Sequence, residues 1–140
     1  MNTPEKPVGL TRDAGWQFGL RKTFPFSQKY LWDFLFSEQG LKLWLGELEE
    51  ALSIKQPYRT QQGIEGTVRV FNPYSHVRMT WKKKEWQNVS TVQVRVMGSN
   101  EKAVISFHQE KMADSIQRDE MKEYWNQKMK EIETALTPSK

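Results

Sequence analysis

The chain has 140 residues, a formal net charge of +4 and 37% hydrophobic residues, which suits a single domain with one hydrophobic core. It contains no cysteine, so disulfides and thiolate metal sites are excluded. No apolar run approaches the roughly 20 residues that a membrane span requires, and the opening MNTPEKPVGL lacks the apolar centre of a signal peptide. We therefore expect a cytoplasmic protein without a membrane partner.

The first predicted element is a strand at residues 15–24, GWQFGLRKTF. Trp16, Phe18 and Leu20 alternate with polar or small residues, which is the period of a half-buried strand. Residues 1–14 hold two prolines and no apolar run, so we expect a flexible N-terminal tail.

Two short helices are predicted after a break at Pro25. Ser27 is suited to cap a helix that begins at Gln28, because its hydroxyl can accept a backbone N–H of the first turn. Gly40 is predicted to be a helix stop or a hinge. The segment LKLWLG at 41–46 then predicts a second, shorter helix.

The central part of the chain, from Tyr58 onward, predicts about five strands joined by short turns, including those at 72–75 and 98–100. Consecutive strands with such turns favour an antiparallel meander. The apolar residues expected to face inward are Val68, Val70, Val77, Met79, Trp81, Val92, Val94, Val96, Ala103, Ile105 and Phe107.

The C-terminal part predicts one long helix, with Asp114 and Gln117 as a capping pair. Its apolar residues fall within about 80° of arc and form one stripe on a helix of roughly 30 Å. They are Met121, Trp125, Met129, Ile132 and Leu136. The order of elements predicts an α+β helix-grip domain over residues 15–137, a bent antiparallel sheet wrapped around the C-terminal helix. Residues 138–140 are expected to fray.

Several segments carry a family resemblance that covers roughly residues 16–136. In chain order they are residues 27–36, LKLWLG at 41–46, the glycines of GIEGTV at 63–68, Asn72-Pro73 leading to Met79-Thr80-Trp81, and Trp125. On these segments the chain resembles the START-like (SRPBCC) superfamily, with its Bet v-like helix-grip fold. Within it, the chain resembles the AHSA-type branch related to the activator of the 90-kDa heat-shock protein ATPase. Tyr124, where the family often has glycine, and the acidic ELEE at 47–50 depart from the pattern.

The resemblance implies a hydrophobic cavity between the long helix and the sheet. In the family this cavity serves lipids, polyketides or other apolar small molecules. The family also includes chaperone-binding members, which implies a possible role in the stress response, and a few enzymes.

The candidate ligand-binding residues come from three faces that are expected to converge on this cavity. Methionine adapts to irregular apolar shapes, and a concave apolar space is the usual ligand site. The predicted lining is Trp44, Val70, Met79, Trp81, Val94, Ile105, Phe107, Met121, Trp125 and Met129. The alternative is that these side chains are ordinary core.

Metal binding and catalysis find little support in the sequence. His76 and His108 are predicted on different strands, on the face opposite Met79 and Phe107, and no cysteine can assist them. Glu47, Glu49 and Glu50 of ELEE could supply a pair of carboxylates for catalysis, but this segment is most simply explained as a solvated loop. No serine lies in a nucleophile-elbow pattern and no glycine loop can cradle a phosphate. We therefore expect no catalytic residues, no metal and no cofactor.

The segment WKKKEWQN at 81–88 raises the question of nucleic-acid binding, because aromatic and cationic side chains hold single strands. The run is short, and strand alternation places Trp81 inward and Trp86 outward. The lysines are better explained as a solvated strand end that discourages edge pairing. No nucleic-acid partner is expected.

The sequence thus favours a non-enzymatic monomer that binds a small hydrophobic molecule, namely a lipid, a polyketide or an aromatic compound. One alternative is a co-chaperone-like module that docks on a heat-shock chaperone. Another is an enzyme acting on an aromatic or polyketide-like substrate.

Overall fold

The structure is a computed structural model that describes residues 10–11 and 15–136. Within the predicted N-terminal tail, the two residues of β1 pair with β2, and the rest of the tail and residues 137–140 lie outside the described residues. The elements are β1 (Leu10–Thr11), β2 (Gly15–Phe24), α1 (Gln28–Leu35), α2 (Glu38–Trp44), β3 (Pro57–Arg59), β4 (Glu65–Asn72), β5 (His76–Trp81), β6 (Ser90–Gly98), β7 (Ala103–Met112) and α3 (Ser115–Leu136).

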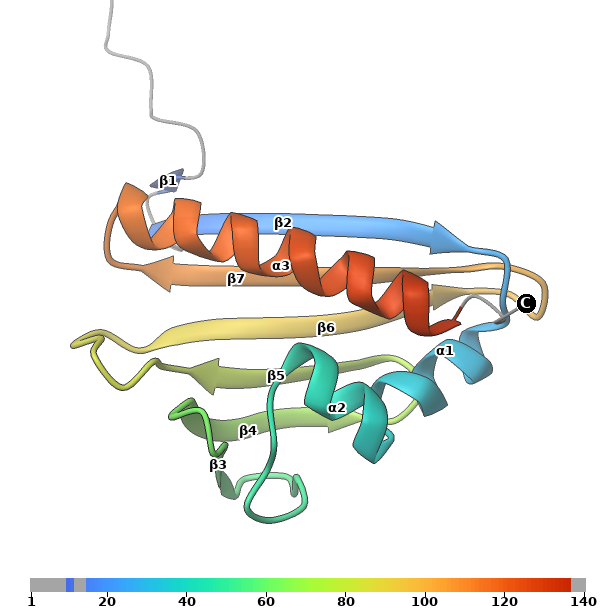
Figure 1. The fold of residues 1–140 in the computed structure, drawn as a ribbon, viewed down its shortest axis with the longest axis horizontal. Coiled ribbons are helices and arrows are strands. Elements are labelled where there is room, and N and C mark those ends of the chain that lie inside the picture. Colours follow the sequence, from blue (N-terminus) through green and yellow to red (C-terminus); the bar gives the residue numbers. More distant parts are fainter. Residues whose placement is uncertain (1–9, 12–14, 137–140) are drawn as a thin grey trace, which may run out of the picture.

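The strands form one antiparallel sheet in the order β1-β2-β7-β6-β5-β4-β3. The three helices lie on one face of this sheet, with α3 over β2 and β7 and with α1 and α2 beside it (Figure 1). The predicted helix-grip architecture is therefore confirmed. None of the helices among residues 15–136 is long and apolar enough to cross a membrane.

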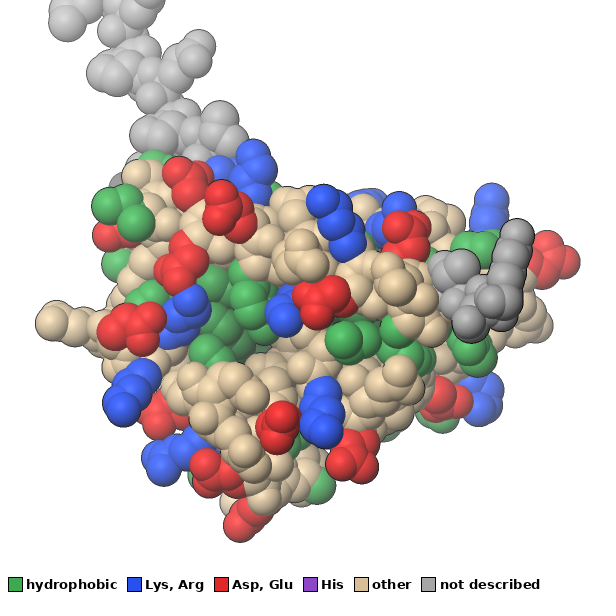
Figure 2. All heavy atoms as spheres, in the orientation of Figure 1, with side chains coloured by type: hydrophobic (Ala, Val, Ile, Leu, Met, Phe, Trp, Pro, Cys, Tyr) green, Lys and Arg blue, Asp and Glu red, His purple; other side chains and the backbone are tan. Residues whose placement is uncertain are grey.

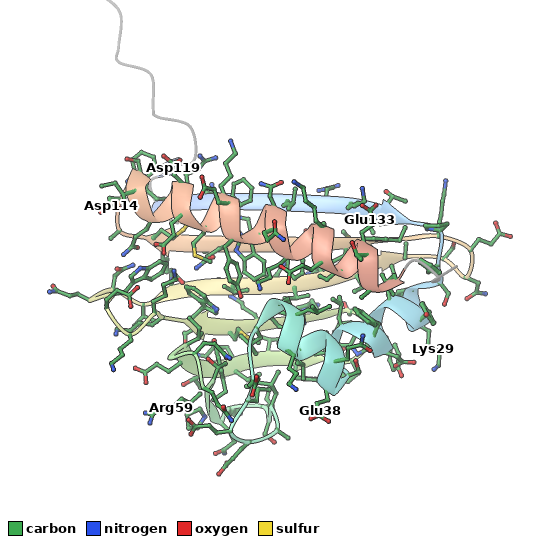
Figure 3. All side chains as sticks on the ribbon, in the orientation of Figure 1. Lys29, Glu38, Arg59, Asp114, Asp119 and Glu133 are labelled. Carbon is green, nitrogen blue, oxygen red and sulfur yellow. The ribbon has the colours of Figure 1, made fainter. Side chains whose placement is uncertain are left out.

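Two helices, α1 and α3, begin where the capping residues predict, whereas α2 begins at Glu38, before the predicted residue 41. The Oγ of Ser27 accepts the backbone N–H of Tyr30 at 3.0 Å at the start of α1. The carboxylate of Asp114 accepts the backbone N–H of Gln117 at 2.8 Å at the start of α3. Near the other end of α3, Glu133 meets Lys22 of β2 at 3.0 Å (Figure 3). Asp114 and Gln117, the predicted capping pair, thus mark where the long helix begins.

Gly40 is neither a helix stop nor a hinge, and on this point the prediction was wrong. It lies in the first turn of α2 and is buried, and its N–H is capped by the Oγ of Ser37 at 3.1 Å. A Cβ at this position would lie 1.9 Å from the carbonyl oxygen of Phe34. Glycine is required because the start of α2 passes directly against the end of α1.

Val70 does not face the core, because β4 carries a β-bulge. Val68 pairs with Met79, yet Val70 pairs with Arg78, so two steps along β4 match one step along β5. The extra residue reverses the alternation, which leaves Val70 37% exposed on the outer face. Phe71 takes the inward position instead and contacts Trp32 of α1 edge-on, with ring centroids 6.3 Å apart.

Trp86 also differs from the prediction. β5 ends at Trp81, so strand alternation no longer applies five residues later. Trp86 is only 6% exposed, and its ring lies 5.2 Å from that of Trp81 in an edge-on contact. The β5–β6 connection therefore folds an indole back onto the core and leaves its lysines at the surface.

Candidate binding groove

Nine of the ten predicted lining residues come together in the hydrophobic core between α3 and the sheet, and Val70 is the exception. Phe107 stacks on Trp125 with ring centroids 4.5 Å apart, and Trp44 lies 6.1 Å from Phe107. These rings contact one another directly, so in this structure they are core residues. A ligand among them remains a prediction.

A groove opens at the surface next to this core, with a volume of about 380 Å³. Four segments line it: α2 and the residues after it, the β3–β4 loop, the β5–β6 connection, and α3. Figure 2 shows hydrophobic side chains exposed in a hollow beside α3, with basic and acidic side chains around it. The lining residues are Lys42, Leu43, Leu45, Gly46, Gln62, Ile64, Lys83, Lys84, Glu85, Tyr124 and Lys128.

The apolar surface of the groove consists of Leu43, Leu45, Ile64 and the ring of Tyr124. Leu45 and Ile64 belong to the buried core, whereas Leu43 and Tyr124 are half-buried and packed against it. The groove and the core are thus one continuous apolar region.

Tyr124 separates the groove from the tryptophans behind it. Its hydroxyl donates to the backbone carbonyl of Trp44 at 2.6 Å, and its ring lies 6.1 Å from that of Trp81. Burial, with a smaller contribution from Glu131, raises the pKa of the Tyr124 hydroxyl well above its ordinary value. The phenol therefore stays protonated and keeps its role as a donor.

The indole Nε1 of Trp81 is buried and has no hydrogen-bond acceptor among the described residues. Trp81 is itself fully buried and lies next to Tyr124 and Trp86. An unpaired buried donor is costly, so a hydrogen-bond acceptor brought to this indole would be stabilising.

The rim of the groove is cationic. Four lysines line it against one carboxylate, Glu85. Lys83 is paired with Glu120 of α3, and Lys128 lies 3.6 Å from Glu131 and 5.2 Å from the centre of the Tyr124 ring. The other two rim lysines, Lys42 and Lys84, are exposed and have no ion pair within residues 15–136.

A chain of polar groups crosses the core and was not predicted. Trp125 Nε1 donates to Gln109 at 2.8 Å, Gln109 Nε2 donates to Ser90 at 2.9 Å, and Ser90 donates to the carbonyl of Trp81 at 2.6 Å. Gln109 and Ser90 are both fully buried. The signal was present in the sequence, because both occupy inward positions of otherwise apolar alternations on β7 and β6.

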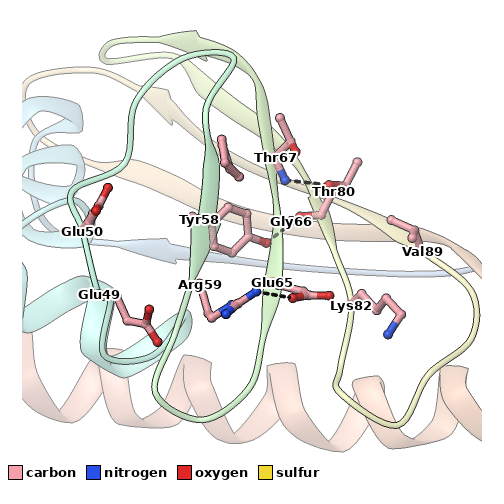
Figure 4. A pocket seen from close by; sticks show the side chains of 11 residues that line it. Glu49, Glu50, Tyr58, Arg59, Glu65, Gly66, Thr67, Thr80, Lys82 and Val89 are labelled. Carbon is pink, nitrogen blue, oxygen red and sulfur yellow. Dashed lines mark hydrogen bonds and ion pairs between the residues drawn. The ribbon is translucent and has the colours of Figure 1, made fainter.

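A second pocket, of about 460 Å³, lies at the β3 edge of the sheet (Figure 4). Its lining includes three carboxylates, from Glu49, Glu50 and Glu65, and Arg59 contacts Glu65 at 3.4 Å. Its apolar lining comprises Pro57, Tyr58 and Val89, and Tyr58 belongs to the same buried core as the tryptophans. We take the smaller groove as the candidate site because Tyr124 in its lining lies beside Trp44 and Trp81, and because its rim is cationic whereas the edge pocket carries three carboxylates.

The two histidines lie on the outer face of the sheet, on different strands, as predicted. His76 contacts the hydroxyl of Ser75 at 2.9 Å, and His108 contacts the side chain of Gln17 at 2.9 Å. Burial, with help from Arg95, lowers the pKa of His76. Within residues 15–136 no group of three or more potential ligands is arranged to hold a metal.

Three solved structures share the fold of this chain at low sequence identity. DynU16, a protein of the dynemicin biosynthetic locus, has a TM-score of 0.74 at 12% identity, over 83% of this chain and 45% of its own. CalU16 from Micromonospora echinospora has a TM-score of 0.77 at 14% identity, over 88% of this chain and 76% of its own. PFC0360w, an HSP90 activator from Plasmodium falciparum, has a TM-score of 0.60 at 16% identity, over 69% of this chain and 74% of its own.

These likenesses support the fold alone, and this chain spans less than half of DynU16. A comparison with curated protein sequences gives no match. The family comparison is decisive, because the model of the Activator of Hsp90 ATPase homolog 1-like proteins matches residues 26–137. Since that match covers most of the chain, the protein belongs to the Activator of Hsp90 ATPase homolog 1-like family, as the sequence resemblance predicted.

Proposed function

We propose that the protein binds a small apolar molecule, without catalysis, in the groove between α2, α3 and the β5–β6 connection. The observation that carries the proposal is the apolar floor of this groove, which is continuous with the tryptophan core. The volume of about 380 Å³ falls in the range of small-molecule sites. One structural neighbour comes from a biosynthetic locus, which is in line with a small-molecule ligand.

In this proposal, the nine buried residues of the predicted lining form the inner end of the site. A ligand that displaces the ring of Tyr124 contacts Trp81 and Trp44 next. The unpaired Nε1 of Trp81 gains a hydrogen bond when the ligand brings an acceptor. Lipids, polyketides and aromatic compounds all combine an apolar body with a few acceptors, so each class fits this arrangement.

The test uses the neutral apolar dye Nile red and two tryptophan substitutions. Leu43→Trp places a large side chain in the groove, whereas Val89→Trp places one in the separate pocket at the sheet edge. We expect saturable, stoichiometric binding of Nile red by the parent protein and by Val89→Trp, and loss of binding in Leu43→Trp with its melting temperature retained. Absence of saturable binding by the parent, or loss in Val89→Trp alone, contradicts the proposal.

A second function, activation of a heat-shock chaperone ATPase, is favoured by the family and by the HSP90 activator among the structural neighbours. Its test is the ATPase rate of purified Hsp90 with and without the protein. A stimulation that is unaffected by Leu43→Trp supports a chaperone role that is separate from the groove. No stimulation at any ratio of the two proteins removes this candidate.

The third interpretation, an enzyme acting on an aromatic or polyketide-like substrate, has less support. Among the described residues that line the groove, Glu85 is the one carboxylate, and the exposed side chain of Glu85 has no histidine beside it in the lining. The groove therefore lacks a histidine–carboxylate pair among the described residues, which leaves this interpretation with less support. The cytoplasmic location and the monomeric state stay predictions from the sequence.

A further inference from the structure

We propose that the ligand of this groove is an amphipathic anion, and that Lys42 and Lys84 bind its carboxylate or phosphate group. The inference rests on the proposed function and adds the chemical class of the ligand. It starts from the difference between the floor of the groove, which is apolar, and its rim, which is cationic.

The charges of the rim are unevenly compensated. Lys83 is held by Glu120, and Lys128 has Glu131 nearby and the ring of Tyr124 beneath it. The Lys83–Glu120 pair joins the β5–β6 connection to α3, whereas Lys128 and both of its partners lie within α3. Lys42 on α2 and Lys84 on the β5–β6 connection have no such carboxylate within residues 15–136.

The two unpaired ammonium groups belong to different segments that line the same groove. A lysine ammonium is a strongly hydrated point charge on a flexible stem, so it reaches an anionic group at the mouth of a pocket and leaves the apolar body of the ligand inside. Once Lys83 and Lys128 are set against Glu120 and Glu131, Lys42 and Lys84 face the single carboxylate of Glu85, so the rim keeps a net positive charge.

The apolar part of the ligand lies on Leu43, Leu45 and Ile64, against the ring of Tyr124. This combination fits a fatty acid or an alkyl phosphate, and it fits an aromatic acid equally well. A neutral apolar molecule uses the floor and leaves the rim unpaired. A cationic amphiphile places like charge beside the lysines, which is unfavourable.

The experiment compares probes that share one alkyl chain and differ in the head group. Decanoate, decyl phosphate and decyltrimethylammonium, each below its critical micelle concentration, and decan-1-ol, below its solubility limit, are titrated into the 140-residue protein and followed by calorimetry. We expect both anions to bind more tightly than decan-1-ol, and decyltrimethylammonium to bind most weakly. Higher ionic strength weakens the binding of the two anions and leaves that of decan-1-ol unchanged.

The variant Lys42→Gln/Lys84→Gln tests the residues. We expect it to lower the affinity for decanoate by roughly three- to twentyfold, as for exposed charge contacts, and to leave decan-1-ol binding unchanged. The matched control, Lys102→Gln/Lys122→Gln, removes the same charge at exposed positions outside the groove lining. This control retains the parent affinity for every probe.

The results that overturn the inference separate it from the proposed function. Equal binding of decanoate and decan-1-ol, with no effect of Lys42→Gln/Lys84→Gln, contradicts the inference that the ligand carries an anionic head group. The proposal of an apolar binding site is not affected by that result. Binding of acetate or inorganic phosphate as tight as that of decanoate shows a simple anion site. Binding to phosphatidylglycerol vesicles without binding of monomeric decanoate shows a membrane surface instead. Failure of all four probes to bind removes both proposals together.

Discussion

Trp125 of α3 and Gln109 of β7 are joined by a hydrogen bond of 2.8 Å inside the core, where both side chains are fully buried. The same indole stacks on Phe107 with ring centroids 4.5 Å apart. The long helix is therefore held to the sheet by an apolar contact and a directional polar contact at one residue. The polar contact continues through Ser90 to the backbone of β5.

We expect Trp125→Ala to lower the free energy of unfolding by about 3–5 kcal/mol, because a large buried ring is replaced by a cavity. Urea denaturation followed by far-UV circular dichroism measures the loss. Gln109→Met removes the acceptor and leaves the indole N–H unpaired, at a cost of about 1–3 kcal/mol.

The variant Trp125→Phe with Gln109→Met tests whether the two residues act as a pair. It removes the donor and the acceptor together, so we expect a smaller loss than the sum of the losses measured for Trp125→Phe alone and Gln109→Met alone. Strictly additive effects contradict the importance of the hydrogen bond and leave packing as the whole explanation.

The second prediction concerns two buried phenols. Tyr58 donates to the carbonyl of Thr80, and Tyr124 donates to the carbonyl of Trp44. Burial raises the pKa of both hydroxyls, with smaller contributions from Tyr124 at Tyr58 and from Glu131 at Tyr124. An unfolded chain ionises its tyrosines near pH 10, whereas the folded protein keeps these two protonated. Above about pH 10 the folded state binds more protons, so the free energy of unfolding falls as the pH rises.

Tyr58→Phe/Tyr124→Phe is expected to be less stable at neutral pH, by about 1 kcal/mol for each lost hydrogen bond. Its stability declines less steeply than that of the parent protein above about pH 10, because two linked protons are gone. Urea denaturation at a series of pH values measures both slopes. Tyr30→Phe, at a position 51% exposed, serves as the control and keeps the parent slope. Parallel slopes for all three proteins contradict the prediction.

The sequence predicts the strands, the caps and the stripe of α3 well, because these features repeat with a local period. Each failure has a physical reason that lies outside that period. Val70 faces outward because one extra residue in β4 reverses the alternation, and Trp86 is buried because β5 ends before it. The hydrogen bonds of Gln109 and Ser90 in the core were not predicted, because their partners lie far away in the sequence.

The groove shows the same limit of sequence-based prediction. The lysines at 82–84 are predicted as a solvated strand end, and nothing local in the sequence connects them to Lys42. The fold brings Lys83 and Lys84 to one groove together with Lys42 and Lys128. The predicted lining identified the core behind the groove, because buried apolar positions can be recognised from alternation, whereas the mouth of a site depends on loops.

The third prediction tests the close approach of α1 and α2. Gly40→Ala introduces a Cβ that meets the carbonyl oxygen of Phe34, so the two helices must separate. We expect a loss of at least about 1–3 kcal/mol, although alanine is the better helix former by about 1 kcal/mol. The control is Gly19→Ala on the exposed outer face, where the nearest atom is a side-chain carbon of His108 at 3.4 Å. A melting temperature for Gly40→Ala at or above that of Gly19→Ala contradicts the proposed contact.

The last prediction compares Val70 and Phe71, neighbours whose roles are set by the bulge in β4. Phe71 faces inward, with its ring 5.8 Å from that of Phe36 and 6.3 Å from that of Trp32, whereas Val70 is 37% exposed opposite Arg78. Phe71→Ala is therefore expected to lower the free energy of unfolding by about 2–3 kcal/mol, because three packed rings lose one member. Val70→Ala should cost well under about 1 kcal/mol, as is usual for surface positions. A regular strand without the bulge places Val70 inside and Phe71 outside, so it gives the opposite ranking in the same urea denaturation experiment.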